Sequence, residues 1–284
     1  MDRISQQIEE ASRRAALARA SEANLAKPGS SPGAVASIAV PAAAGNPVPT
    51  SLPEGQQLEL DFDELRTQCV VNGGQSKFAE VYRILRTRVL QQMRQNGWTT
   101  LGVTSPNPQA GKTTTATNLS LAIARDPSYR SILMDCDFRR PGVRHSLMTD
   151  PDQGLIDYLS GTAKLSEIIY AAGSSDWRVM FAGPNPYDAP SELLNSDRMR
   201  ELLRMIGEEQ ERTIAVIDLP PSSVGDDVLA LSAQLDAMLV VVEDGSTDER
   251  ELQNTMALLR DSKILGLVLN KAEKSADFVH SYYG

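Results

Sequence analysis

The chain has 284 residues, 41% of them hydrophobic, which is enough to bury a sizeable core and excludes a short disulfide-stapled scaffold. Its 28 basic and 37 acidic residues give a formal net charge of -9, which argues against nucleic-acid binding through a broad basic surface. The two cysteines, Cys69 and Cys136, lie far apart and form no C-x-x-C pair, as is usual in a reduced cytoplasm. No apolar run approaches the roughly 20 residues of a membrane span, so we expect no direct span.

The first sixty residues differ in composition from the rest. Residues 1–20 contain strong helix formers but only a thin apolar stripe. Pro, Gly, Ala and Ser dominate residues 27–55, where aromatic residues are absent, and such a stretch buries too little apolar surface to offset the entropy lost on ordering. We therefore predict a flexible N-terminal segment and linker over residues 1–60, a folded domain over 61–271 and a flexible tail over 272–284.

Residues 76–93 predict an amphipathic helix. Its apolar positions fall on one stripe, which consists of Phe78, Val81, Tyr82, Leu85, Val89 and Met93. Glu80, Arg83 and Arg86 recur at three-residue steps beside this stripe. On the residues alone these charges have two interpretations, a solvated face with intrahelical ion pairs or a functional cluster.

The feature that points most directly to a ligand is a loop between a strand and a helix. A β-like run at 99–104 enters a Pro-rich turn, and Gly111-Lys112-Thr113 then opens a helical stretch. This order is the context of a phosphate-binding loop, in which backbone N–H groups and the helix dipole hold a triphosphate. Lys112 would place a cation on the β and γ phosphates, and the Thr113 hydroxyl would be a ligand of Mg²⁺. The alternative is a Gly-Lys-Thr turn that only caps a helix.

Downstream of this loop, apolar β-like runs alternate with helix-like segments. The runs lie at 131–135, 178–182, 213–218, 237–242 and 264–270, and the clearest helical segments lie at 165–171, 191–206 and 247–260. Continuous apolar strands that alternate with helices indicate an α/β fold with a mostly parallel sheet flanked by helices. Ligands of such sheets bind at the carboxyl ends of the strands.

Acidic side chains stand where two of these strands end. Asp135 and Asp218 each close an apolar run, and Asp137 follows two residues after Asp135. A buried carboxylate is costly unless it is paired or metal-bound, and Mg²⁺ beside a phosphate loop explains all three. We expect Asp218 to hold the ion through water and Asp135 to reach the metal shell or the attacking hydroxyl. Each acid taken alone has the alternative of a helix N-cap or a turn residue.

Ordered motifs from about Ser76 onward carry a resemblance to a known family. They comprise Glu80-Val-Tyr-Arg83-Ile-Leu-Arg86, Asp135-Cys-Asp137-Phe-Arg-Arg-Pro141, Gly154-Leu-Ile-Asp-Tyr-Leu-Ser-Gly161, Pro190-Ser-Glu-Leu-Leu-Asn-Ser196, Asp218-Leu-Pro-Pro221 and the terminal Tyr282-Tyr283. The chain resembles the bacterial tyrosine kinases (BY-kinases) of capsule and exopolysaccharide synthesis, of the cytoplasmic type that includes exosortase-associated autokinases. The first motif matches the family's E-x-x-R-x-x-R oligomerisation motif, and the second matches its Walker A′ sequence. At the phosphate loop the chain has Pro108-Gln109-Ala110 where the family commonly has Pro-Gly-Glu.

This resemblance implies an ATP- and Mg²⁺-dependent protein-tyrosine autokinase with a P-loop NTPase fold of the ParA/MinD-like (SIMIBI) type. It also implies a ring-like homo-oligomer that pairs with a membrane chain-length or co-polymerase protein, in the cytoplasm at the inner face of the cell membrane, and regulates exopolysaccharide polymerisation and export. The residues expected to act are Lys112, Asp135 and Asp137 in catalysis; Gln109, Ala110, Gly111, Lys112, Thr113, Thr114 and Asn270 in nucleotide binding; Thr113, Asp135 and Asp218 in metal binding; Tyr282 and Tyr283 as phosphoacceptors in trans; and Glu80, Arg83 and Arg86 in oligomerisation.

Two other functions stay open from the sequence. The first is an ATPase switch of the ParA/MinD type, a group with a signature lysine just after the first residue of its loop, where this chain has Asn107. The second is a non-catalytic nucleotide-binding regulator of polysaccharide assembly, against which the intact loop lysine and strand-end aspartates argue. Asn270-Lys271, which end the last predicted strand, likewise have two interpretations, a contact with adenine implied by resemblance to related ATPases and a strand-end cap.

Overall fold

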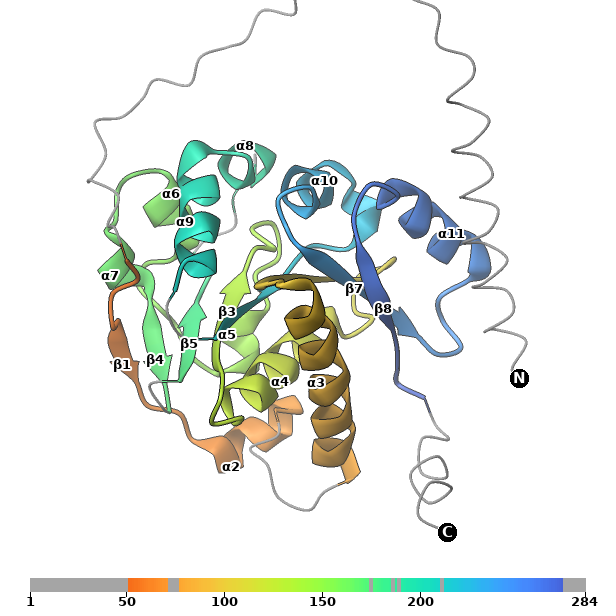
Figure 1. Ribbon diagram of the computed structural model, residues 1–284, viewed down its shortest axis with the longest axis horizontal. Coiled ribbons are helices and arrows are strands. Elements are labelled where there is room, and N and C mark those ends of the chain that lie inside the picture. Colours follow the sequence, from red (N-terminus) through yellow and green to blue (C-terminus); the bar gives the residue numbers. More distant parts are fainter. Residues whose placement is uncertain are drawn as a thin grey trace, which may run out of the picture. The chain divides into compact units, whose positions relative to one another are not determined.

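The computed structural model describes residues 51–70, 77–173, 176–184, 187, 190–209 and 212–272 (Figure 1). Most of the predicted flexible N-terminal segment and linker lies outside these residues, as do the predicted phosphoacceptors Tyr282 and Tyr283. Within the described ranges, no helix combines the length and the apolar character needed to cross a bilayer.

Eight strands form one sheet in the order β1-β4-β5-β3-β6-β2-β7-β8, and every neighbouring pair is parallel except β4 and β5. In chain order the strands are β1 (Gln56–Leu58), β2 (Thr100–Thr104), β3 (Arg130–Asp135), β4 (Tyr170–Ala172), β5 (Trp177–Met180), β6 (Thr213–Asp218), β7 (Ala237–Glu243) and β8 (Ile264–Asn270). Figure 1 shows β1 at one edge of the sheet and β8 at the other. The mostly parallel sheet predicted from the sequence is confirmed.

The central strands are buried on both faces. All residues of β2 and of β6 are buried, so neither strand shows the alternation of a sheet with one wet face. Parallel strands need crossover connections, and the helices of these connections cover both faces of the sheet. The carboxyl ends of the strands are then the edge at which a ligand can be bound.

One face of the sheet is covered by α2 (Phe62–Leu65), the 3-10 turn η1 (Arg66–Gln68), α3 (Lys77–Asn96), α4 (Lys112–Ala124) and α5 (Val143–Ser146). Helices α3 and α4 lie side by side in Figure 1. Val89 and Met93 of α3 and Leu119 of α4 pack there with Leu133 of β3. This packing fixes α4, the helix that the phosphate loop opens.

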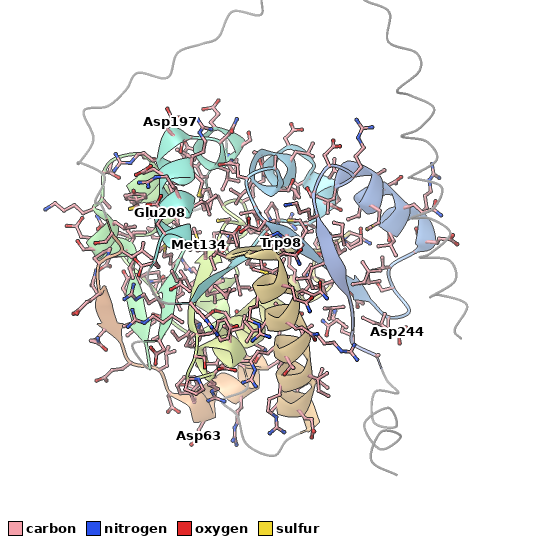
Figure 2. All side chains as sticks on the ribbon, viewed as in Figure 1. Asp63, Trp98, Met134, Asp197, Glu208 and Asp244 are labelled. Carbon is pink, nitrogen blue, oxygen red and sulfur yellow. The ribbon has the colours of Figure 1, made fainter. Side chains whose placement is uncertain are left out.

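The opposite face is covered by α6 (Leu155–Leu159), α7 (Leu165–Ile168), α8 (Pro190–Leu194), α9 (Asp197–Gly207), the 3-10 turn η2 (Ser222–Val224), α10 (Asp226–Ser232) and α11 (Glu249–Leu258). Met134 of β3, which Figure 2 labels, is buried in this second core with Phe138, Tyr158 and Leu202. Successive residues of β3 therefore point into different cores, as the pleat of a strand requires.

Strand β1 lies before residue 61, where the folded domain was predicted to begin. Gln56 N donates to Ile169 O at 2.8 Å, and Leu52 is buried. The stretch has the polar, Pro-containing composition of a linker, and it gains its order from pairing with β4. Pairing with a distant strand is a tertiary effect that local composition does not report.

Three further local predictions are corrected by the structure. The helix expected at 165–171 ends at Ile168, and β4 follows it. The helix expected at 191–206 is divided into α8 and α9, because the Ser196 side chain caps α9 by accepting from Met199 N. On α3 the predicted apolar stripe does not all face the core, since Phe78 and Val81 are exposed.

Gly102 of β2 offers a test of how tightly the centre of the sheet is packed. A Cβ there would lie 2.6 Å from the Met238 sulfur and 2.8 Å from a Leu235 methyl group. We expect Gly102→Ala to lower the free energy of unfolding by about 1–3 kcal/mol, because the neighbours must shift. The matched control is Gly266→Ala in β8, where an added Cβ meets nothing within 4 Å. Urea denaturation measures both variants, and equal losses would contradict the packing argument.

Candidate active site

The phosphate loop follows β2 and ends at Gly111, which caps the N-terminus of α4. Gly111 has a φ of 92°, and an added Cβ would lie 2.0 Å from Asn270 Nδ2. Glycine alone meets both the conformational and the steric demand. The N–H groups in the first turn of a helix have no partners inside the helix, and with the helix dipole they make this terminus suited to an anion.

Lys112 follows this cap, and its ammonium group lies among the predicted aspartates. Lys112 Nζ donates to Asp137 Oδ2 at 2.8 Å and lies 3.6 Å from Asp218 Oδ1. All three side chains are buried. Burial disfavours a charged lysine, but the carboxylates of Asp218 and Asp137 outweigh burial and raise the pKa of Lys112. The lysine therefore carries its positive charge in the site.

The Thr113 hydroxyl group is hydrogen-bonded to the Asp218 oxygen that lies farther from Lys112, Oδ2. Thr113 Oγ1 donates to Asp218 Oδ2 at 2.6 Å. Asp218 Oδ1 is buried and has no hydrogen-bond partner among the described residues, although the Lys112 ammonium group stands at ion-pair distance. Burial raises the pKa of Asp218, because a carboxylate deprived of water is costly to ionise. One acceptor oxygen at the N-terminus of α4 is thus available to a ligand.

Asp135 and Asp218 are register partners on the neighbouring strands β3 and β6. Asp135 Oδ2 accepts from the backbone N–H groups of Gly142 at 3.0 Å and Val143 at 2.9 Å, and its Oδ1 accepts from Asp137 N at 3.2 Å. Burial, followed by the charge of Asp218, raises the pKa of Asp135 to about 8. Asp135 therefore orders the loop before α5 and binds a proton more readily than an exposed aspartate.

The donor set suits Mg²⁺. In the described part of the chain, no group of three or more His, Cys, Asp or Glu side chains is placed to hold a metal by itself. Mg²⁺ in a nucleotide site needs only one or two carboxylates, since phosphate oxygens and water complete its shell. The Thr113 hydroxyl, the Asp218 oxygen without a hydrogen bond and the Asp135 carboxylate supply the hard oxygen donors that the ion prefers.

Asn270 lies at the end of β8, where its side chain contacts the loop. Asn270 Nδ2 donates to Ala110 O at 2.8 Å, so Asn270 fastens the loop to the end of a strand, while its contact with adenine stays a prediction. Gln109 is exposed and has a φ of 64°. Thr114 is half-buried in the first turn of α4, and its carbonyl accepts from Asn118 Nδ2 at 2.9 Å.

Other residues that hold the loop were not foreseen from the sequence. Lys271 Nζ donates to Gln109 O at 2.9 Å and pairs with Glu243 at 2.9 Å. Asn107 Nδ2 donates to Glu251 Oε2 at 2.6 Å. The sequence marked Lys271 only as a possible adenine contact or strand-end cap, and no local pattern marks the two glutamates, because the loop that these residues help to hold lies far away in the sequence.

Arg139, within the motif that matches Walker A′, is paired inside the chain. Its Nε donates to Asp227 Oδ2 at 2.6 Å, and Asp227 is buried in the first turn of α10. The pair joins the loop after β3 to the helix that follows β6. In the sequence, the one feature that marks Asp227 is that it is an acidic residue near a helix N-terminus.

Glu80, Arg83 and Arg86 lie on α3 and take no part in the cluster around Lys112. Arg83 pairs with Glu80 at 3.7 Å along the helix. Arg86 is half-buried, and its Nη1 donates to Ala122 O at 3.3 Å in the last turn of α4. The motif therefore combines a partly exposed ion pair with an arginine that stabilises the C-terminus of a neighbouring helix.

Comparisons with known proteins identify the family. No protein-family model matches the chain. The tyrosine-protein kinase Etk of Escherichia coli (strain K12) is 31% identical over 206 residues, which cover 72% of this chain and 28% of Etk. The tyrosine-protein kinase CpsD of Streptococcus pneumoniae serotype 4 is 31% identical over 209 residues, which cover 71% of this chain and 87% of CpsD. The chain belongs to the bacterial tyrosine kinases. The family predicted from its motifs is confirmed.

A solved structure supports the same assignment. The kinase domain of the BY-kinase Etk superposes with a TM-score of 0.65 at 27% identity, covering 72% of this chain and 81% of that domain. The predicted α/β fold, a mostly parallel sheet flanked by helices, is confirmed and is shared with this kinase domain. This chain spans little more than a quarter of the length of Etk, at 28%, so it matches only part of that relative.

Asp135 makes the stability of the ligand-free BY-kinase chain depend on pH. Folding raises its pKa from the ordinary value of 3.8 to about 8. Between these values the folded state binds more protons than the unfolded state, so the contribution of Asp135 to stability falls as the pH rises from about 4 to 8. Asn cannot ionise. We expect the free energy of unfolding of Asp135→Asn, taken relative to that of the parent, to increase from pH 5 to pH 8. Urea denaturation without Mg²⁺ measures it.

The matched control is Asp261→Asn, because the Asp261 side chain is 89% exposed. The free energy of unfolding of this control should differ from that of the parent by the same amount at pH 5 and at pH 8. If the difference between Asp135→Asn and the parent also stayed constant from pH 5 to pH 8, the raised pKa of Asp135 would be wrong.

Proposed function

We propose that the chain is an ATP- and Mg²⁺-dependent protein-tyrosine kinase that phosphorylates its own C-terminal tyrosines, Tyr282 and Tyr283, in trans. The observation that carries the proposal is the position of Lys112, a charged lysine at a phosphate-loop helix terminus, 2.8 Å from Asp137 and 3.6 Å from Asp218. A cation fixed there neutralises charge on a transferring phosphoryl group. Membership of the BY-kinases supports tyrosine as the acceptor.

The nucleotide would be bound mainly by the loop. The N–H groups around Gly111 and in the first turn of α4 would bind its phosphates. The Lys112 ammonium group would leave Asp137 and contact the β and γ phosphates. In the ligand-free chain the ion pair with Asp137 holds the ammonium group close to where it is needed. Thr113, Asp135 and Asp218 would hold Mg²⁺, which supplies positive charge to the phosphate oxygens.

The acceptor tyrosine must lose a proton as the phosphoryl group arrives. A bond forms between the phenol oxygen and the γ phosphorus, the bond from that phosphorus to the β–γ bridging oxygen breaks, and ADP leaves. The phenol has a pKa of about 10, so a positioned base is required, and Asp135 and Asp137 are the candidates.

The proposed partners are further copies of the chain in a ring-like homo-oligomer, and a membrane chain-length or co-polymerase protein. This partner would hold the kinase in the cytoplasm at the inner face of the cell membrane, where it would regulate exopolysaccharide polymerisation and export. Helix α3 supports the contact between copies. Phe78, Val81 and Ile84 are exposed at three-residue steps, by 41–42%, beside the Glu80–Arg83 pair. Exposed apolar side chains rimmed by charge are typical of protein contacts.

Asn107 argues against an ATPase switch of the ParA/MinD type. It occupies the position of that group's signature lysine, and its amide is bound to Glu251 at 2.6 Å within the chain. A neutral side chain held in this way brings no positive charge to a nucleotide.

We expect Arg83→Ala to weaken the oligomer. At a contact between subunits the Glu80–Arg83 pair would be desolvated, and removing one charge would leave the other unpaired. Light scattering should show a shift toward monomer, whereas Arg88→Ala, an exposed arginine elsewhere on α3, should keep the parent mass. Arg86 is unsuitable for this test, because its substitution also removes the bond to Ala122. A monomeric parent, or an unchanged mass for Arg83→Ala, would contradict the contact.

We expect Lys112→Met to lower autophosphorylation at least about 100-fold, since it removes a charge from the transferring group. A phosphotyrosine immunoblot with ATP and Mg²⁺ measures the rate, and circular dichroism verifies the fold. The control is Lys263→Met, an exposed lysine just before β8. Labelling of a folded Lys112→Met chain at the parent rate would show that the site is assigned wrongly.

The same variant tests transfer between chains. A Lys112→Met chain with its native tail is mixed with an active chain that carries Tyr282→Phe and Tyr283→Phe. Phosphotyrosine should appear on the Lys112→Met chain. Its absence, in mixtures where both chains are found in one oligomer, would rule out phosphorylation in trans.

A further inference from the structure

Two side chains at the end of β8 bind consecutive carbonyl groups of the phosphate loop. Lys271 Nζ donates to Gln109 O at 2.9 Å, and Asn270 Nδ2 donates to Ala110 O at 2.8 Å. Glu243, at the end of the neighbouring strand β7, pairs with Lys271 at 2.9 Å and so orients its ammonium group. The loop is thus held from the side of β7 and β8.

These bonds fix the direction of the N–H groups of the loop. In a planar trans peptide the C=O and N–H groups point to opposite sides. Holding the Gln109 carbonyl toward Lys271 therefore turns the Ala110 N–H away from β8. Holding the Ala110 carbonyl toward Asn270 does the same for the Gly111 N–H. Consecutive N–H groups turned to one side form a concavity that binds anions.

Gln109 makes this arrangement costly. Its φ of 64° lies in the left-handed region, which glycine adopts freely and a residue with a Cβ adopts only with strain. The Gln109 side chain is exposed, so its packing does little to hold the backbone in place. The bond from Lys271 to the Gln109 carbonyl is an interaction that can offset the strain.

We propose that Lys271, oriented by Glu243, is a positioning residue that holds Gln109 in the left-handed conformation and so presents the Ala110 and Gly111 N–H groups to the phosphates of a nucleoside triphosphate. The identity of this ligand rests on the proposed function. Lys271 acts on the side of the loop that faces away from the anion, and Glu243 balances its charge.

The experiment compares the affinity of the full chain and its variants for a fluorescent N-methylanthraniloyl derivative of ATP. In Lys271→Met we expect the dissociation constant to rise about tenfold and the KM for ATP to rise with it. The kcat should change little, because the substitution disturbs the conformation of the loop and leaves the groups that act in phosphoryl transfer in place. Lys271→Arg should retain most of the affinity, since a guanidinium group also donates to a carbonyl. Lys263→Met removes the same charge at the opposite end of β8 and should bind as the parent does.

A Gln109→Gly background decides whether Lys271 acts through the backbone. Glycine adopts a φ of 64° without strain, so Lys271→Met should weaken binding less than about threefold in that background. Equal losses in both backgrounds would overturn the proposal, because they would show that the lysine acts by its charge on the phosphates. Unchanged binding by Lys271→Met in the native background would overturn it as well.

Binding and phosphorylation separate this inference from the kinase assignment. A parent chain that binds the derivative but forms no phosphotyrosine would refute the kinase, and the affinities of the variants would still decide the role of Lys271. A parent that phosphorylates itself, with a Lys271→Met variant of normal affinity, would refute only the positioning role. A parent that binds no nucleotide would overturn both.

Discussion

A lysine is buried among aspartates at the N-terminus of α4. Lys112, Asp137 and Asp218 lie within ion-pair distance, and Asp135 is fully buried beside them. Each ion loses its hydration on burial, a cost of several kcal/mol that only well-placed partners offset. Such partners exist because β3 and β6 end in register, which sets Asp135 opposite Asp218. The carboxylates still outnumber the lysine, and a divalent cation would offset their remaining negative charge.

The frame around this cluster comes from elements that are distant in sequence. The sheet, with a core on each face, fixes the strand ends, while the loop that reaches over them contains the strained Gln109. Side chains from β8 and α11 hold that loop by its carbonyl groups and by Asn107. A loop secured from its outer side keeps its N–H groups free for an anion. Rigid supports of this kind are what electrostatic stabilisation of a transferring phosphoryl group requires.

Features that depend on neighbouring residues along the chain could be predicted from the sequence. Continuous apolar runs alternating with helical periodicity predicted the parallel sheet, because strands covered on both faces need apolar side chains on both. The run Gly111-Lys112-Thr113 after a β-like segment indicated a phosphate loop between a strand and a helix. Aspartates at the ends of parallel strands were expected to lie close to this loop. The structure brings Lys112, Thr113, Asp137 and Asp218 together. These inferences need only the period of a strand or helix and the order of elements along the chain.

The pairing of groups that lie far apart along the chain could not be predicted in this way and depends on the packed fold. It placed β1 in the sheet, turned Arg86 onto the end of α4, joined Arg139 to Asp227, and directed Asn270 and Lys271 at the loop. The strand order β6-β2-β7-β8 explains the last of these, since it brings the end of β8 close to a loop some 160 residues earlier in the chain. A hydrogen bond depends on distance and direction in space, and neither quantity is encoded in the local pattern of residues around its donor or its acceptor.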